Sequence, residues 1–264
     1  MELSSLAARR EVFGRYASAR RAARIPGYRV DVRPDVTRHL PAGDSDEALL
    51  SFARLEAADA ERRISEELAY LKQNGLEAEW KLHDFDTPDD LKARLQAHGL
   101  TCHQVEALMM LALEDARIEP RSVPGVVIEQ AQGPALHEIA ALQEEVWSCR
   151  LPWLPDVLTA MIDPVYCARA NGRVVGSGWI DFHGGSDFAQ LCGGAVVEGY
   201  RGRGIYSLLF DRRIAEAKRR GTPFIAVDAA PLSRPILESK GFQFVCNTHP
   251  MRTRPFDTGA VSRG

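Results

Sequence analysis

The sequence predicts an α+β fold, in which helices pack against a mixed sheet of parallel and antiparallel strands. Residues 189–209 read as a strand, a glycine-punctuated turn and the start of a helix. Across that turn the spacing of apolar residues changes from 2 to 3.6, as it does between strand and helix. Asn171-Gly172 joins two alternating segments and indicates an antiparallel hairpin. A further strand, helix and strand follow within 224–247.

The composition is that of an ordinary globular protein. The 264 residues allow one large domain or two small ones, and 45% are hydrophobic and 26% charged. A net charge of -3 gives no reason to expect nucleic acid or an anionic membrane as a partner. No stretch is long and apolar enough to cross a bilayer, and the N-terminus lacks the features of a signal peptide. We therefore expect a cytoplasmic protein.

The cysteines indicate reduced thiols and no metal centre. Five of them are widely spread and contain no C-x-x-C pair. His98, Cys102 and His103 would need a carboxylate to complete a metal site, and a turn between helix and strand explains them better.

Before residue 118 the patterns predict three helices and three strands. We expect an arginine-rich helix over 2–24, a helix that Asp44 or Ser45 caps and that runs to Asn74, and a helix that opens at Thr87-Pro88 and ends at Gly99. The strands are expected at 28–32, 79–83 and 105–113. Two prolines mark 118–125 as a linker.

After the linker the predicted order is strand, two helices, three antiparallel strands, helix, strand, helix, strand. The expected ranges are 126–128, 134–147, 151–161, 165–170, 173–182, 188–197, a helix from 205 to about 220, 224–227, a helix from Ser233, and 243–247.

The turn Arg201-Gly202-Arg203-Gly204 predicts a site for a phosphate or diphosphate. A strand that feeds a helix through such a turn leaves N–H groups unpaired at the positive end of the helix dipole. The glycines let the backbone approach the anion closely, and the arginines add positive charge. A dinucleotide fingerprint does not fit, because Ser207 stands near the place of a third glycine, and there is no Walker A lysine. A turn without a ligand remains the alternative.

The same turn resembles motif A of the GNAT acyltransferase superfamily, Gln/Arg-x-x-Gly-x-Gly/Ala. Arg201 and Gly204 occupy the first two defined places, and Tyr206 stands where the motif has a small residue. Residues 233–242, ending in Gly241-Phe242, resemble the second signature of the superfamily. The resemblance covers about 126–254 and implies the GNAT acyl-CoA N-acyltransferase fold.

The N-terminal half echoes the second half in weakened form. The first half has a strand, a helix that ends in Gly99-Leu100, and a second strand. The second half has the same order: a strand, a helix that ends in Gly241-Phe242, and a second strand. We interpret residues 28–115 as a degenerate, partial repeat without the phosphate loop, similar to an N-terminal extension in one group of bacterial GNAT proteins. The predicted domains are 1–120, a helical arm plus this half-domain, and 121–264, with a disordered tail after about 254.

The resemblance implies transfer of an acetyl or other acyl group from acetyl-CoA to a primary amine, and we expect a small acceptor. The turn would hold the diphosphate, and the strand before it would bind the pantetheine arm as an added strand. The implied coenzyme contacts are Ala195, Val196, Val197, Arg201, Gly202, Arg203, Gly204, Ile205, Tyr206, Ser207 and Ser233. Tyr206 either lies over the coenzyme or packs on the sheet.

The catalytic groups depart from the pattern of the family. Gln190 and Leu237 stand where members carry a glutamate base and a tyrosine acid, so neither can perform that role. Asp228 is a candidate base or a cap of the next turn. Ser233 is a candidate donor to the thiolate or a helix N-cap. Candidates for the acceptor pocket are Glu144, Glu145, Trp147, Trp153, Tyr166 and Gln190.

Two other functions stay open at this stage. An acetyl-CoA-binding sensor or scaffold would keep the coenzyme and lose the reaction. A nucleic-acid-associated protein would use the arginine-rich first helix. The sequence also leaves a homodimer open.

Overall fold

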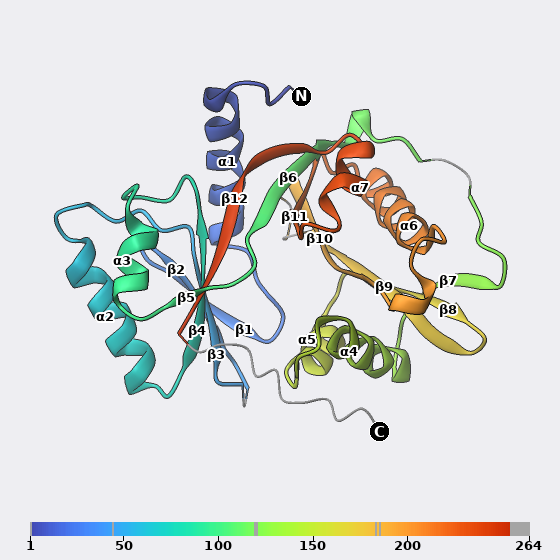
Figure 1. Ribbon diagram of the computed structural model, residues 1–264, viewed down its shortest axis with the longest axis horizontal. Coiled ribbons are helices and arrows are strands. Elements are labelled where there is room, and N and C mark those ends of the chain that lie inside the picture. Colours follow the sequence, from blue (N-terminus) through green and yellow to red (C-terminus); the bar gives the residue numbers. More distant parts are fainter. Residues whose placement is uncertain (1, 44, 119–120, 183, 185, 254–264) are drawn as a thin grey trace. The chain divides into compact units, whose positions relative to one another are not determined.

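The computed structural model describes residues 2–43, 45–118, 121–182, 184 and 186–253 (Figure 1). The described residues divide into two compact units: unit 1 is residues 2–110 with 228–253, and unit 2 is residues 111–227. The chain passes between them within two strands, β6 (Glu106–Ala112) and β11 (Phe224–Ala229). The predicted domains 1–120 and 121–264 stay a prediction, and the predicted tail after 254 lies outside the described residues.

Unit 1 is a mixed sheet with helices. The strands lie in the order β1 (Tyr28–Val32), β2 (Thr37–Pro41), β3 (Glu47–Ser51), β4 (Glu77–His83), β12 (Gln243–Arg252) and β6, and β5 (Thr101–Cys102) pairs with β12. The helices are α1 (Leu6–Arg21), α2 (Ala60–Gln73), α3 (Leu91–Ala97) and α7 (Arg234–Ser239). The core of the unit contains Leu50, Ile64, Trp80, Leu91 and Leu95, all at most 1% exposed.

One predicted helix of unit 1 is wrong in its first half. The helix expected from residue 45 to Asn74 begins only at Ala60, and Glu47–Ser51 is strand β3 instead. β3 pairs antiparallel with β2 and parallel with β4, so both of its edges are hydrogen-bonded. Tertiary pairing therefore overrides the helical spacing of Leu49 and Phe52. Pro88 likewise does not open a helix, because α3 begins at Leu91.

The two units repeat one topology. In unit 1, β1, β2 and β3 are antiparallel neighbours, α2 follows, and β4 lies parallel to β3. In unit 2 the same holds for β8 (Val165–Ala170), β9 (Arg173–Asp181), β10 (Phe188–Val196), the helix α6 (Ile205–Arg220) and β11. The segment before α2 has no glycine and contains Glu56 and Asp59. Unit 1 is thus a partial repeat that lacks the glycine turn.

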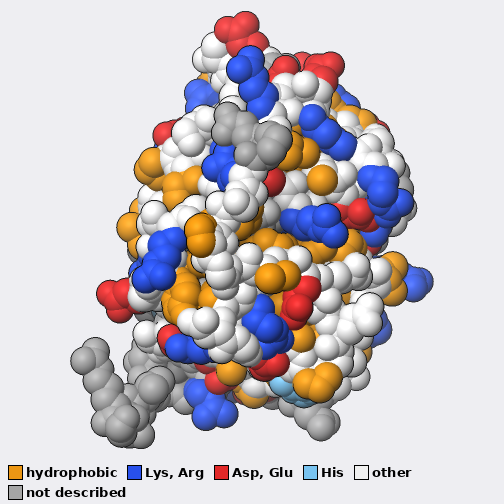
Figure 2. Space-filling model, turned by 90° about the vertical axis from the view of Figure 1, so that its right-hand side faces the viewer, with side chains coloured by type: hydrophobic (Ala, Val, Ile, Leu, Met, Phe, Trp, Pro, Cys, Tyr) orange, Lys and Arg blue, Asp and Glu red, His pale blue; other side chains and the backbone are white. Residues whose placement is uncertain are grey.

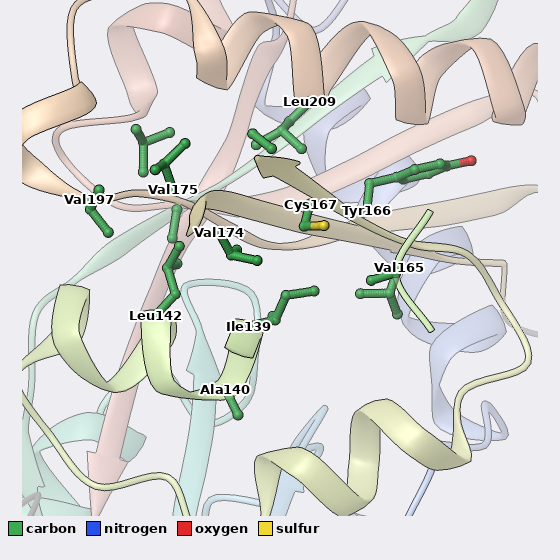
Figure 3. Close-up of a cluster of buried hydrophobic side chains, with 14 of the residues drawn as sticks. Ile139, Ala140, Leu142, Val165, Tyr166, Cys167, Val174, Val175, Val197 and Leu209 are labelled. Atoms are coloured by element: carbon green, nitrogen blue, oxygen red, sulfur yellow. The ribbon is translucent and has the colours of Figure 1, made fainter. Parts of the chain in front are cut away.

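Unit 2 is a mixed sheet between helices. Its strands lie in the order β11, β10, β9, β8, β7 (Val126–Gln130), with β10 and β11 parallel and the others antiparallel. Helices α4 (Pro134–Trp147) and α5 (Leu154–Ala160) come between β7 and β8. Figure 3 shows Leu209 of α6 on one side of the sheet and Ile139 and Leu142 of α4 on the other. The mixed α+β fold predicted from the sequence is confirmed.

Local sequence explains the bounds of unit 2 well. Asn171 and Gly172 both have positive φ (50° and 77°), as a two-residue turn between β8 and β9 requires. Gly221, with φ 71°, ends α6, and its N–H bonds to the carbonyl of Ala217.

On the face shown in Figure 2, basic side chains lie among acidic ones rather than in one large patch. Among the described residues, no helix is both long and apolar enough to span a membrane.

Candidate functional site

A bulge interrupts strand β10 near its end. The pairing with β9 shifts between Cys192 and Ala195, and Gly193 lies in the bulge with φ 58°. A Cβ atom on Gly193 would lie 1.7 Å from Cζ3 of Trp179, so a side chain cannot fit there while that ring stays in place. Bulges re-aim a strand and often lie beside functional sites.

Polar side chains from the helices on both sides of the sheet hold the bulge. Nε2 of the buried Gln143, from α4, donates to the carbonyl of Gly193 and to Oγ of Ser177, both at 2.8 Å. From α6, Nη1 of Arg213 donates to the carbonyl of Cys192 at 3.3 Å. The bulge is therefore a fixed feature of the backbone, because its carbonyls are bonded in place.

Beyond the first residues of β10, its edge toward β11 is open. The parallel pairing runs from Phe188 to Gln190, whereas β10 continues to Val196. Between Leu191 and Val196 the strand therefore makes no ladder pairs on that side within the described part of the chain. Such an edge offers N–H and C=O groups to an extended ligand.

The open edge leads into the predicted glycine turn. Gly202 and Gly204 have φ 73° and 85°, values that side chains rarely adopt. Gly204 is the N-cap of the 16-residue helix α6, and no side chain caps that terminus. Its first N–H groups and the positive end of the helix dipole are thus available to an anion.

Both arginines of the turn are held by backbone carbonyls. Nε of Arg201 donates to the carbonyl of Val196 at 3.0 Å, and Nη2 of Arg203 donates to that of Gly199 at 2.9 Å. The Arg203 guanidinium also lies 4.9 Å from the ring centre of Tyr200. Two positive charges are therefore fixed beside the uncapped end of α6, which suits a diphosphate.

The other predicted coenzyme contacts divide between the two units. Ala195, Val196 and Val197 are buried, and Ile205 anchors the start of α6 in the core of unit 2. Ser207 and Tyr206 follow in the first turn of α6 and are half-buried. Ser233 belongs to unit 1. As coenzyme contacts, all of these residues stay predictions.

Asp228 is part of a buried charge cluster in unit 1. Oδ2 accepts from Nζ of Lys81 at 2.6 Å, and Oδ1 accepts from Oγ1 of Thr248 at 2.9 Å. Burial is the largest single effect and would raise the pKa of Asp228, but the charge of Lys81, together with His83 and the hydrogen bonds from Lys81 and Thr248, lowers it. Asp228 is thus a weaker base than an exposed aspartate, and its catalytic role stays a prediction.

Ser233 precedes α7, and its hydroxyl does not cap that helix. Oγ donates to the carbonyl of Ala230 at 3.0 Å, and no side chain bonds to the first N–H groups of α7. Ser233 thus occupies the N-cap position of α7, as the alternative expected, but its hydroxyl bonds to the preceding turn and makes no capping hydrogen bond. Its contact with the coenzyme remains a prediction.

Sequence reasoning did not select Glu106. Its raised pKa predicts that the stability of the protein depends on pH. Burial raises its pKa from 4.5 to about 7, although Lys81 opposes the shift. Between these values the folded state keeps a proton that the unfolded state loses, so stability is full below pH 4.5 and falls as pH rises to about 7. We expect Glu106→Gln to remove up to about 3 kcal/mol of this fall in urea titrations at several pH values. Glu114→Gln, at an exposed acid, should keep it; a Glu106→Gln curve parallel to wild type would contradict the assignment.

Two acidic residues predicted for the acceptor pocket make local contacts. Oε1 of Glu144 accepts from the N–H of Leu151 at 2.7 Å and fixes the turn after α4. Oε2 of Glu145 pairs with Arg173 at 2.7 Å on the surface. These contacts explain both carboxylates structurally, and their role toward an acceptor stays a prediction.

The remaining pocket candidates differ in exposure. Trp147 is 50% exposed, and its Nε1 donates to Oε1 of Gln143 at 2.9 Å, which ties it to the bulge. Trp153 packs against the core, and Tyr166 is buried within it. Gln190 is buried at the last paired position between β10 and β11. Of these four, Trp147 is linked to the bulge through Gln143, and all four stay predictions.

A cavity of about 610 Å³ lies elsewhere in unit 2. Its lining includes Gln130, His137, Thr159 and Val165, and none of the predicted site residues. Val165 is the first residue of β8. The end of β10, at Val196, pairs with Gly176 of β9, and Gly176 pairs with Ala168 in the second half of β8. The cavity is thus at the opposite end of the strands from the glycine turn. The described residues contain no group of three or more His, Cys, Asp or Glu side chains arranged to hold a metal.

Sequence reasoning missed the residues that shape the bulge, Gln143, Trp179 and Arg213. The pair Gly193-Gly194 within an apolar strand was the available signal, since glycine in a strand often marks a bulge. The partners of the bulge come from elements that are distant in sequence, and no local pattern indicates them.

Comparisons with known proteins agree with this geometry. The model of the acetyltransferase (GNAT) family matches residues 134–235, which include α4, the bulge and the glycine turn. No curated protein matches the chain in sequence.

Solved structures share the fold. A GCN5-related N-acetyltransferase from Kribbella flavida matches with a TM-score of 0.68 and 15% identity, over 90% of this chain and 94% of that one. One from Sphaerobacter thermophilus matches with a TM-score of 0.57 and 16% identity, over 86% and 79%. A tandem GNAT protein from the clavulanic acid biosynthesis pathway matches with a TM-score of 0.58 and 12% identity, over 84% and 79%. The chain has the GNAT fold, and the match to the acetyltransferase (GNAT) family model covers residues 134–235 of it.

Proposed function

We propose that this protein is a cytoplasmic N-acyltransferase that moves an acetyl group from acetyl-CoA to the primary amine of a small acceptor. One observation supports the proposal above all: the open edge of β10 leads directly into the uncapped, arginine-flanked start of α6. An extended carrier with a diphosphate at one end matches this arrangement. The strand edge suits the amides of a pantetheine arm, and the turn suits the diphosphate.

The residues of this chain bind and orient in this proposal. The N–H groups from Gly202 to Ser207 would hold the diphosphate, and the edge of β10 up to the bulge would align the arm. The coenzyme supplies the activated thioester. Alignment of thioester and amine contributes much of the rate, because it removes the entropic cost of bringing two reactants together.

A second candidate is a sensor or scaffold that binds acetyl-CoA without transferring the acyl group. It is favoured by the residues that occupy the positions where a catalytic acid and base are expected. Gln190 is an amide, Leu237 is fully buried, and Asp228 is paired with Lys81. None of the three is a ready proton acceptor or donor at neutral pH.

Two measurements on the full chain distinguish these functions. Calorimetry with acetyl-CoA tests binding, and release of free thiol in the presence of a panel of small amines tests transfer. Binding with amine-dependent thiol release supports the enzyme. Tight binding without release at any amine supports the sensor, and no heat at millimolar acetyl-CoA would refute both.

We expect Gly204→Glu to weaken acetyl-CoA binding by about 10-fold to 100-fold, which corresponds to about 1.4 to 2.8 kcal/mol. The added carboxylate would repel the diphosphate, and its Cβ would hold the backbone away from it. Gly221→Glu is the matched control, because Gly221 is also exposed and has positive φ, but at the other end of α6. Equal calorimetric affinities for the two variants would contradict the location of the site.

A further inference from the structure

Two segments of the chain form the cavity of about 610 Å³ in unit 2. One is the turn from β7 into α4, within 130–137, and the other leads from the end of α5 into β8, within 158–165. The N–H of Ala131 donates to the carbonyl of Val165 at 2.8 Å and holds the two segments together. Sites for small molecules have volumes of about 300 to 1,000 Å³, so the cavity is large enough for such a ligand.

The floor of the cavity is apolar and belongs to the core. Four lining side chains are part of the hydrophobic core of unit 2 and are at most 9% exposed: Ala131, Leu136, Leu158 and Val165. Ile162 is also in the lining and is 95% exposed. Core packing holds the floor in place, and an apolar group bound there would remove surface of Ile162 from water.

Three polar side chains of the lining are available to a ligand. They are the amides of Gln130 and Gln132 and the imidazole of His137, and all three residues are exposed. Within the described part of the chain, none of these side chains makes a hydrogen bond or an ion pair. An amide group both donates and accepts hydrogen bonds, and a neutral imidazole does so through its two nitrogens. The cavity therefore suits a ligand that has a donor and an acceptor of its own.

The described lining residues offer no unpaired charge. They include no lysine or arginine, and their one carboxylate, Asp163, is already bonded. Its Oδ1 accepts from Nη1 of Arg220 at 2.7 Å, and its Oδ2 accepts from the N–H of Phe182 at 3.0 Å. A cationic ligand would thus compete with Arg220, and an anionic one would meet the Asp163 carboxylate.

The start of α4, which is part of the wall, is not an anion site either. Pro134 has no N–H group. The N–H groups of Ala135 and Leu136 donate to the carbonyls of Gln132 and Gly133, at 3.2 and 3.1 Å. A phosphate or carboxylate would therefore find no unpaired amides at this turn, in contrast to the glycine turn before α6.

We propose that this cavity is a second ligand site of the protein, for a small uncharged molecule with an apolar body and an amide-like group. The body would lie on the core floor, and the amide-like group would bond to Gln130, Gln132 or His137. The site is separate from the bulge: His137 is six residues from Gln143 on α4, about 9 Å along the helix. The inference does not depend on the proposed function, because no part of the coenzyme takes part.

The test uses benzamide and cyclohexanecarboxamide, two uncharged probes with an amide on an apolar ring. The full chain is titrated with each probe and followed by NMR of its backbone amides. We expect at least one of them to bind with a dissociation constant of about 1 mM, an affinity that nine non-hydrogen atoms can supply. Benzoate and benzylammonium carry a charge on the same ring as benzamide and should bind at least 10-fold more weakly, because the cavity has no free partner for a charge.

Thr159→Trp locates the ligand. Thr159 is an exposed lining residue, so the indole should fill the cavity and weaken binding of the probe at least 10-fold without disturbing the core. Ala160→Trp is the matched control, because Ala160 is the next residue, is also exposed and is absent from the lining. Circular dichroism checks that both variants are folded.

Three results would overturn the inference. The first is that neither uncharged probe binds at about 10 mM. The second is that Thr159→Trp and Ala160→Trp bind the probe equally well, which would place the ligand elsewhere. The third is that benzoate or benzylammonium binds as tightly as benzamide, which would contradict the uncharged class of ligand. None of these results bears on the coenzyme site, because acetyl-CoA is absent from the experiment.

Discussion

Gly193→Ala is expected to lower the free energy of unfolding by about 2 to 5 kcal/mol. The new methyl group would overlap the Trp179 ring, since its position is 1.7 Å from Cζ3 and 2.2 Å from Cη2. Forced displacement of a packed side chain costs about 1 to 3 kcal/mol, and alanine at φ 58° adds about 1 to 2 kcal/mol of backbone strain. The ring also cannot swing away without exposing apolar surface of unit 2, against which it packs. Urea unfolding followed by circular dichroism measures the loss.

Gly202→Ala separates strain from overlap. Gly202 has φ 73°, but no atom would lie within 4 Å of its added Cβ. This variant should therefore lose only the strain, about 1 to 2 kcal/mol. Combining Gly193→Ala with Trp179→Leu should recover part of the loss relative to the sum of the two single changes. Gly193→Ala that is no less stable than Gly202→Ala would show that the bulge is not shaped by this ring.

Lys81→Met is expected to destabilise the protein by about 3 to 5 kcal/mol at pH 7, the usual result of removing one partner of a buried ion pair. Asp228 would keep only the Thr248 hydroxyl among the partners described above, while its side chain is 8% exposed. In wild type the lowered pKa of Asp228 stabilises the folded state at pH values above the pKa of Asp228 in the unfolded chain. This stabilisation is lost as the pH falls through its pKa in the folded state.

The variant should show the opposite trend with pH. Without Lys81, burial raises the pKa of Asp228, so its neutral form is favoured in the folded state and stability recovers as pH falls. Asp228→Asn in the Lys81→Met background should restore part of the loss at pH 7, because it removes the buried charge that Lys81 neutralises in wild type. Lys72→Met, at an exposed lysine of α2, serves as a control with an expected change below about 0.5 kcal/mol. If Lys81→Met lost as little stability as Lys72→Met, the pair of Lys81 and Asp228 would not be effectively buried.

Much of the fold could be predicted where local signals agree. The predicted bounds 28–32, 134–147 and 165–170 match β1, α4 and β8, and α6 begins at the predicted residue 205. Each of these elements has its own period and its own stop signals, such as Asn171-Gly172 after β8. The glycine turn was predicted in the same way, because its φ values need glycine irrespective of tertiary context.

The sequence-based predictions fail where contacts between segments distant in sequence determine the structure. β3 was predicted as a helix, since its pairing with β2 and β4 is invisible in a local window. Gln143 and Arg213 read as unremarkable polar residues of amphipathic helices, yet both are buried at the bulge. Asp228 was a candidate base or a cap of the next turn, and its partner Lys81 is 147 residues away in sequence.

The sequence by itself determined the alternation of helices and strands, the glycine turn with its unpaired amides and the likeness to the GNAT pattern. These features depend on backbone conformation and spacing within a few residues, which side chains report directly. Only the tertiary structure decided which side chains hold the bulge and which charges pair. Burial and pairing depend on the neighbours that folding brings together, and the order of residues along the chain does not specify those neighbours locally.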